Sequence, residues 1–113
     1  MTPQTEPPDG LVVTAVEWQI VRSILLRHVP GREVWAFGSR VCTKDARCVK
    51  KFSDLDLTVK GDQPLPMRTL AALADDFTES DLPYKVDVVD WATTSARFRA
   101  IIESSHIVLN PAG

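Results

Sequence analysis

The stretch Ser53-Asp54-Leu55-Asp56-Leu57-Thr58-Val59 alternates polar and aliphatic side chains along most of its length. Strict alternation is typical of a half-buried β-strand, in which successive side chains point to opposite faces. The pattern predicts a strand over residues 54–59 with Leu55, Leu57 and Val59 turned inward. Asp54 and Asp56 would then share the other face, where two carboxylates lie close together.

A second predicted strand, over residues 33–37, runs directly into Gly38-Ser39. A glycine at the end of a buried strand allows a ligand to approach the backbone closely, and a serine donates hydrogen bonds from its hydroxyl and amide. Residues 40–53 are polar and basic and are predicted to form a loop. This loop contains five basic residues and one acid: Arg40, Lys44, Arg47, Lys50 and Lys51 against Asp45.

One helix is predicted before these two strands in the sequence and another after them. Residues 14–29 carry an apolar stripe at helical spacing, with Val16, Ile20 and Ile24 broadened by Val21 and Leu25. Thr14 with Glu17 matches a capping box. A second helix should begin near Pro66, with Leu73 and Phe77 on its apolar side.

A third strand is predicted over residues 84–91 and a last helix over residues 94–104, with Phe98, Ile101 and Ile102 directed to the core. The order helix, strand, strand, helix, strand, helix indicates an α/β (α+β) domain in which helices flank a small mixed β-sheet. The three predicted strands would lie side by side.

The chain has 113 residues, of which 44% are hydrophobic and 25% charged, and a net charge of −2. These values predict one domain over residues 11–110, after a disordered tail over residues 1–10. The net charge disfavours direct binding to nucleic acid. No stretch approaches the roughly 20 apolar residues that span a bilayer, and no secretory leader is recognised, so we expect a cytoplasmic protein.

Asp87 lies on the third predicted strand, and adjacency of the strands would bring it next to Asp54 and Asp56. Carboxylates are the ligands that Mg²⁺ prefers, and two such ions can activate an incoming hydroxyl and stabilise a leaving pyrophosphate. Three acids beside a Gly-Ser turn therefore indicate a site for a metal-bound nucleoside triphosphate. An acidic pair on a strand can equally be a solvated outer face.

Cys42 and Cys48 lie close together in the basic loop. Two cysteines do not form a disulfide scaffold, and no zinc-like spacing is present. Free thiols, a loop-closing disulfide and a redox switch all remain compatible with their spacing.

Three segments together resemble the minimal nucleotidyltransferases of the DNA polymerase β-like superfamily. The first is Val34-Trp35-Ala36-Phe37-Gly38-Ser39-Arg40. The second is Phe52-Ser53-Asp54-Leu55-Asp56-Leu57, and the third is Lys85-Val86-Asp87-Val88-Val89-Asp90-Trp91. Proteins of this type typically act as the antitoxin beside a small helical toxin of the HEPN type.

The resemblance implies transfer of AMP from ATP to a hydroxyl, often on a tyrosine of the HEPN partner. By position, it implies that Gly38 and Ser39 hold the triphosphate and that Asp54 and Asp56 bind two Mg²⁺ ions. It also implies that Asp87 completes the metal site and helps to deprotonate the acceptor. Arg40 and Lys50 are further candidates for contacts with the triphosphate.

The loop between Ser39 and Asp54 is longer than is usual in that family, and Thr43 stands near where a glycine is expected. This departure leaves triphosphate geometry and turnover open. An alternative function is a non-catalytic module that neutralises its partner by contact, using apolar helix positions such as Val21 and Leu25. The sequence does not choose the acceptor, the nucleotide, or between a homo-oligomer and a hetero-oligomer.

Overall fold

The computed structural model describes residues 6–41 and 54–109. The elements in chain order are α1 (Ala15–His28), β1 (Val34–Phe37), the 3₁₀ turn η1 (Gly38–Arg40), β2 (Leu55–Val59), α2 (Met67–Glu79), β3 (Val86–Asp90), the 3₁₀ turn η3 (Trp91–Thr93), α3 (Ala96–Ser104) and β4 (His106–Leu109). Across these residues no helix combines the length and the apolar character that crossing a bilayer requires.

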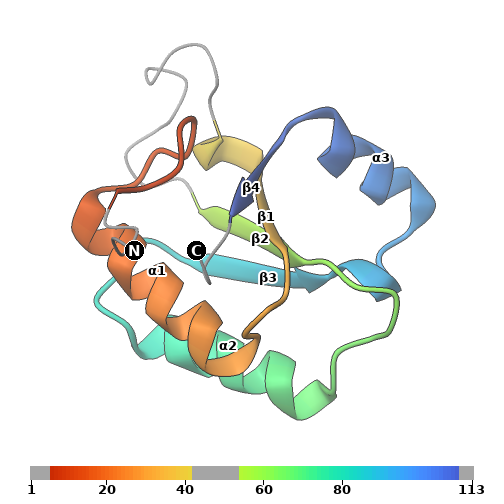
Figure 1. Ribbon diagram of the computed structural model, residues 1–113, viewed down its shortest axis with the longest axis horizontal. Coiled ribbons are helices and arrows are strands. Elements are labelled where there is room, and N and C mark those ends of the chain that lie inside the picture. Colours follow the sequence, from red (N-terminus) through yellow and green to blue (C-terminus); the bar gives the residue numbers. More distant parts are fainter. Residues whose placement is uncertain (1–5, 42–53, 110–113) are drawn as a thin grey trace.

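The four strands form one mixed sheet in the order β3-β2-β1-β4 (Figure 1). β2 and β3 are parallel, whereas β1 is antiparallel to both of its neighbours. The predicted mixed sheet is confirmed, and so is the adjacency of its three expected strands. The prediction was incomplete at the C-terminal end, because β4 was not recognised.

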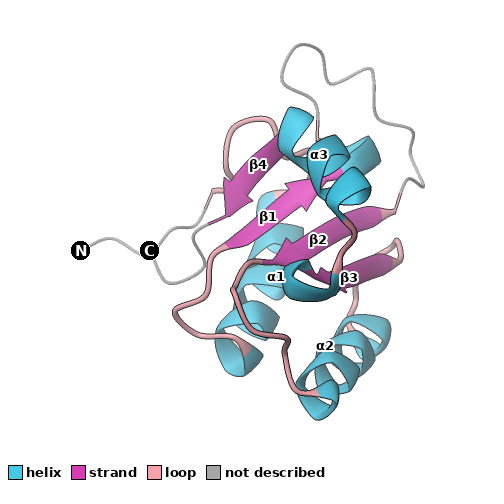
Figure 2. Ribbon diagram, turned by 90° about the vertical axis from the view of Figure 1, so that its right-hand side faces the viewer, coloured by secondary structure: helices cyan, strands magenta, loops and turns pink. Residues whose placement is uncertain are grey.

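Helices cover both faces of the sheet, with α1 and α2 on one side and α3 on the other (Figure 2). On the α1/α2 side, Leu55, Leu57 and Val59 of β2 are completely buried, as their alternation predicts. Leu73 and Phe77 of α2 pack into the same core cluster. The inward aliphatic face of β2 therefore anchors the core, and its polar face is directed to the α3 side.

α1 begins as predicted and buries most of the expected apolar stripe, with the exception of Val16. The Thr14 hydroxyl accepts a hydrogen bond from the Glu17 amide and the Glu17 carboxylate accepts one from the Thr14 amide, which confirms the capping box. Val16, expected on the apolar side, is 72% exposed. The buried stripe consists of Trp18, Val21, Ile24 and Leu25. Burying the large indole of Trp18 removes more apolar surface from water than burying Val16 would.

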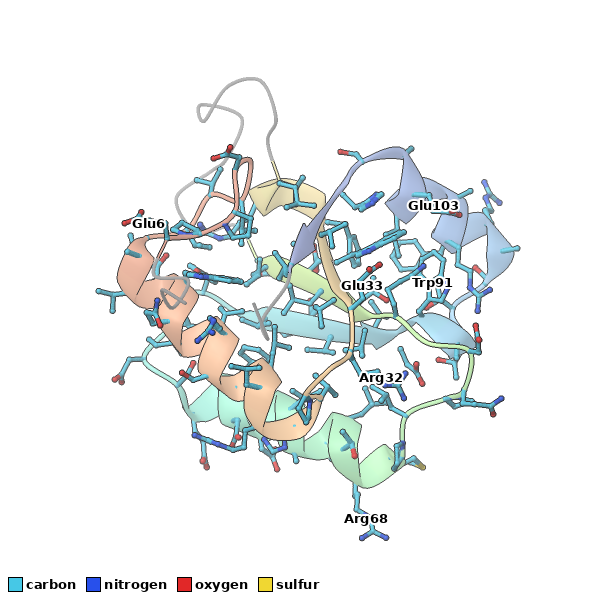
Figure 3. The ribbon with its side chains drawn as sticks, in the orientation of Figure 1. Glu6, Arg32, Glu33, Arg68, Trp91 and Glu103 are labelled. Carbon is cyan, nitrogen blue, oxygen red and sulfur yellow. The ribbon has the colours of Figure 1, made fainter. Side chains whose placement is uncertain are left out.

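The α3 side of the sheet carries a stack of rings and a lysine. The Lys60 Nζ lies 3.4 Å from the ring centroid of Trp91 and 3.8 Å from that of Trp35. The ring of His106 also stacks on Trp35, at 3.8 Å between centroids. Figure 3 shows Trp91 on the side of the sheet where Glu103 and α3 lie. These cation–π and stacking contacts join β1, β4, η3 and the residue that follows β2.

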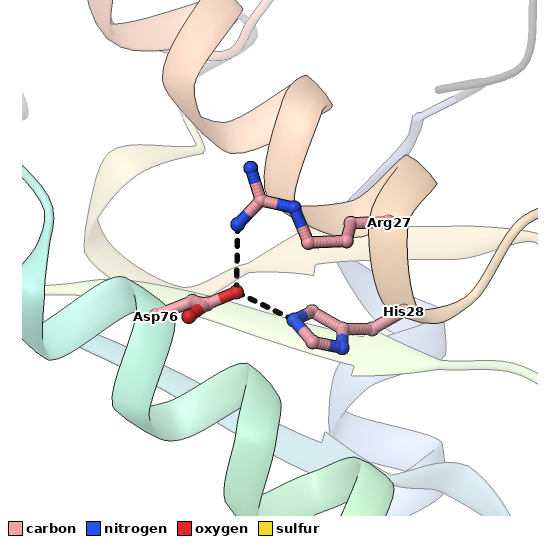
Figure 4. A network of polar contacts seen from close by, with 3 residues as sticks. All are labelled: Arg27, His28 and Asp76. Atoms are coloured by element: carbon pink, nitrogen blue, oxygen red, sulfur yellow. Dashed lines mark hydrogen bonds and ion pairs between the residues drawn. The ribbon is translucent and has the colours of Figure 1, made fainter.

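A polar contact joins the two helices on the opposite side. The Asp76 Oδ2 of α2 lies 3.0 Å from the Arg27 Nη1 and 2.5 Å from the His28 Nε2 (Figure 4). Arg27 and His28 both belong to the last turn of α1. The hydrogen bond from His28, followed by that from Arg27, lowers the pKa of Asp76 below its ordinary value of 3.8. Asp76 therefore accepts hydrogen bonds from both residues as a carboxylate.

Candidate active site

The two central acids of the sequence motif meet across the parallel pair of strands. Asp56 of β2 lies directly opposite Asp87 of β3. Residues in direct register point to the same face, so both carboxylates are directed to the α3 side. Asp54 is exposed immediately before β2, and Lys85 pairs with the Asp87 carboxylate at 3.7 Å. The predicted adjacency of Asp87 to Asp56 is thus present, whereas Asp54 does not line the cleft with them.

Burial and charge act together on Asp56. Partial desolvation first, and then the charges of Asp87 and Asp54, raise the pKa of Asp56 above its ordinary value of 3.8. This is the direction expected when a partly buried carboxylate lies near other carboxylates. A cation would relieve the repulsion, so the donor set suits a divalent ion. Within residues 6–41 and 54–109, however, no three acidic, histidine or cysteine side chains already converge as a metal-binding group.

Gly38 approaches Asp56 closely and has a left-handed backbone, with φ of +80°. A Cβ atom added at Gly38 would collide with the Asp56 carboxylate. Glycine is therefore required both by the local conformation and by the space beside the acid. Ser39 follows within η1, so the Gly-Ser turn begins next to the carboxylates, where the sequence places it.

A cleft of about 640 Å³ opens over these residues. Asp56 and Asp87 line this cleft, and we call these two carboxylates the acidic floor. Gly38 also lines the cleft. The rest of the lining comes from apolar residues of the sheet, from α3 and from the residue after α3: Phe37, Val89, Phe98, Ile101, Ser104 and Ser105.

Phe98 and Ile101 are the residues that sequence analysis misplaced. They were expected in the core, but Phe98 is 36% exposed and Ile101 is 58% exposed, and only Ile102 of the three is buried. Nine residues of helix make less than three turns, so one face suffices to attach α3 to the sheet. The spacing of Phe98 and Ile101 would have revealed a shared face, but no sequence signal directs that face to the acids.

Arg40 is turned away from the cleft lining. It is only 6% exposed, its guanidinium donates to the Val12 carbonyl at 2.9 Å, and it stacks at 3.7 Å on the Tyr84 ring. The Val12 amide in turn donates to the Arg40 carbonyl at 2.9 Å. Arg40 thus fastens the Gly-Ser turn to the segment before α1. The structure does not bring it together with Asp56 and Asp87.

Tyr84, on which Arg40 stacks, also forms a hydrogen bond with α1. The Tyr84 hydroxyl donates to the Glu17 carboxylate at 3.1 Å, and burial, reinforced by Glu17, raises the pKa of Tyr84. Tyr84 lies shortly before β3, which carries Asp87. Arg40 and Tyr84 therefore connect the Gly-Ser turn, the start of α1 and the acidic strand. Lys50 and both cysteines, Cys42 and Cys48, lie outside the described residues.

Comparison with known proteins agrees with this geometry. The model of the family described as polymerase beta, nucleotidyltransferase matches residues 20–111. The chain is also 46% identical over 99 residues to a Haemophilus influenzae protein named probable protein adenylyltransferase MntA. That alignment covers 88% of this chain and 83% of the relative. The range matched by the family model, residues 20–111, contains the Gly-Ser turn, both acidic strands and α3.

Proposed function

Because this chain belongs to the polymerase beta nucleotidyltransferase family, we propose that it transfers AMP from ATP to a hydroxyl group on a small HEPN-type partner protein. Nucleotidyl transfer follows from membership of the family, whereas the donor, the cation and the acceptor are proposals. The single observation that supports them best is Asp56 facing Asp87 in a cleft bordered by Gly38.

Mg²⁺ is the proposed cation, and two ions are proposed at the site. Asp56 and Asp87 would hold them, with Asp54 contributing from the start of β2. The raised pKa of Asp56 supports this assignment, because crowded carboxylates favour a bound divalent cation. When bound, Mg²⁺ neutralises phosphate oxygens and makes a coordinated hydroxyl more acidic.

The residues of the chain itself would bind the phosphates and accept the proton of the acceptor. The backbone at Gly38 and Ser39 would hold the β- and γ-phosphates, so that the α-phosphorus lies over the acids. The Asp87 carboxylate would accept the proton of the acceptor hydroxyl. The new bond joins that oxygen to the α-phosphorus, the bond from the α-phosphorus to the bridging oxygen breaks, and pyrophosphate leaves.

The partner is proposed from the family resemblance and from the relative named as a protein adenylyltransferase. A HEPN-type toxin that is modified and silenced would make this chain an antitoxin. Because ATP is the proposed donor, we place the reaction in the cytoplasm.

Intact-mass spectrometry of the neighbouring gene product tests this function. We expect that incubation with this protein and Mg²⁺-ATP adds one or more AMP units. The double variant Asp54→Ala, Asp56→Ala should add none, and Asp62→Ala, which alters an exposed acid outside the cleft lining, should behave as wild type. An unmodified partner that still forms a stable complex would contradict the catalytic function.

The alternative, neutralisation by contact alone, loses the support first given for it. Val21 and Leu25 were expected to be available to a partner, but both are completely buried. They are part of the core between α1 and the sheet. Contact neutralisation is therefore kept as an outcome of the experiment: it predicts that the Asp54→Ala, Asp56→Ala protein still silences the partner.

A further inference from the structure

The part of α3 that lines the cleft carries two large apolar side chains, Phe98 and Ile101, together with Ser104 at its end. Phe98 lies edge-on to Phe37, with ring centroids 5.7 Å apart and an interplanar angle of 83°. Ile101 follows one turn later, and Val89 of β3 lines the same cleft. We call these four residues, Phe37, Val89, Phe98 and Ile101, the apolar wall. An exposed phenylalanine and an exposed isoleucine beside two carboxylates indicate a surface that binds something.

The apolar wall continues directly into the acidic floor. Asp56 and Asp87 line the same cleft as Phe98 and Ile101, and Phe37 is the direct β1 neighbour of Asp56. A ligand held at the acids by its phosphates would therefore contact the apolar wall with the part that carries no charge.

Two other large aromatic rings on this side of the sheet are already engaged. Trp35 contacts both Lys60 and His106, each 3.8 Å away. Trp91 is covered by Lys60 at 3.4 Å and has the Arg99 guanidinium at 5.0 Å. Phe98, in contrast, meets its ring neighbour only edge-on and is 36% exposed, so a flat group can reach it.

We propose that the apolar wall binds the purine ring of the nucleotide donor, with Phe98 and Ile101 as its principal contacts. This inference rests on the proposed function, which places the phosphates at Gly38 and the acids. The nucleoside must then extend away from the α-phosphorus, and the apolar wall is the uncharged surface of that cleft. Aromatic and aliphatic side chains bind bases through their flat faces, and the larger purine ring gains more contact than a pyrimidine.

Binding of two ligands to the partner-free protein separates base contacts from phosphate contacts. The ligands are Mg²⁺-ATP and Mg²⁺-tripolyphosphate, which has the phosphates but no base, and calorimetry measures both. Phe98→Ala should weaken ATP binding roughly 5- to 150-fold, the range measured for lost base–aromatic stacking. It should leave tripolyphosphate binding unchanged. Phe98→Tyr, which keeps the ring, should bind ATP nearly as wild type.

A matched control and a second substitution complete the test. Met67→Ala removes an apolar side chain that is 86% exposed at the start of α2, and it should change neither affinity. Ile101→Ala should weaken ATP binding selectively, and wild type should bind ATP more tightly than CTP.

Three outcomes would overturn the inference. Equal weakening of ATP and tripolyphosphate by Phe98→Ala would show that the ring only supports the fold of the cleft. Unchanged ATP affinity, even with slower transfer to the partner, would assign the apolar wall to the acceptor instead of the base. Failure of the wild-type protein to bind either ligand would contradict the proposed function itself, which separates that failure from the first two results.

Discussion

Asp56 and Asp87 lie directly opposite each other in the parallel pairing of β2 and β3. They come from strands that are separated along the chain by the whole of α2. The register places two carboxylates on one face, where burial and mutual repulsion raise the pKa of Asp56. The arrangement is unfavourable for the metal-free protein, and this makes its function testable through stability as well as through activity.

Asp56→Asn should abolish AMP transfer and raise the melting temperature of the metal-free protein at neutral pH. Because the pKa of Asp56 is raised in the fold, its charged form destabilises the native state. That penalty is absent below the unfolded pKa, near 3.8, and grows as the pH rises through the folded pKa. We expect a gain of about 1–4 °C at pH 7, allowing for partial exposure.

Thermal unfolding between pH 3.5 and pH 7.5 in the presence of a chelator measures this gain. Asp62→Asn, at an exposed acid, is the control and should show little change. A gain that is equally large at pH 3.5 would argue against charge repulsion as the cause.

Gly38→Ala should impair both folding and transfer. The substitution places a Cβ atom against the Asp56 carboxylate and forces alanine into a backbone with φ of +80°. We expect a loss of about 1–3 kcal/mol in the free energy of unfolding. Gly31 also has a positive φ, of +78°, but an added Cβ there meets nothing within 4 Å. Gly31→Ala should therefore have the strain of the backbone without the collision, and near-normal transfer would be its expected result.

Arg40→Ala should lower the free energy of unfolding by about 1–3 kcal/mol, because it removes a partly buried hydrogen bond to Val12 and the stacking on Tyr84. Arg40→Lys keeps a donor but lacks the planar group, so an intermediate loss is expected. Denaturant unfolding measures both.

The control for Arg40 is Arg68→Ala, at an exposed arginine of α2 that extends away from the ribbon in Figure 3. It should change stability by no more than about 0.5 kcal/mol. If Arg40→Ala left stability unchanged but weakened tripolyphosphate binding, Arg40 would be a phosphate ligand and not a structural clamp.

Asp76→Asn should lower the melting temperature modestly, by about 1–2 °C, since the contact with Arg27 and His28 is partly exposed. The lowered pKa of Asp76 means that its charged form stabilises the fold. This stabilisation is present above the unfolded pKa near 3.8 and disappears as the pH falls through the folded pKa. Melting curves of both proteins should therefore converge in acid, and a difference that persists there would contradict the electrostatic explanation.

Much of the fold was predictable because its signals are local. The alternation of β2, the capping box of α1 and the aliphatic face of α2 each depend on residues close together in sequence. β4 was missed because four residues, His106 to Leu109, carry too little pattern to be recognised. Its strand conformation depends on hydrogen bonds to β1, which lies far away along the chain.

The sequence by itself determined the acidic motif, the Gly-Ser turn before it and the alternation that directs Asp56 away from the core. Tertiary structure alone decided which surface faces those acids. Phe98 and Ile101 were predicted to be core residues because they are apolar. The apolar character of a side chain does not indicate which face of a short helix packs against the sheet. Ile102 is buried while Phe98 and Ile101 line the cleft, and burial of Arg40 against Tyr84 removed a cation from it.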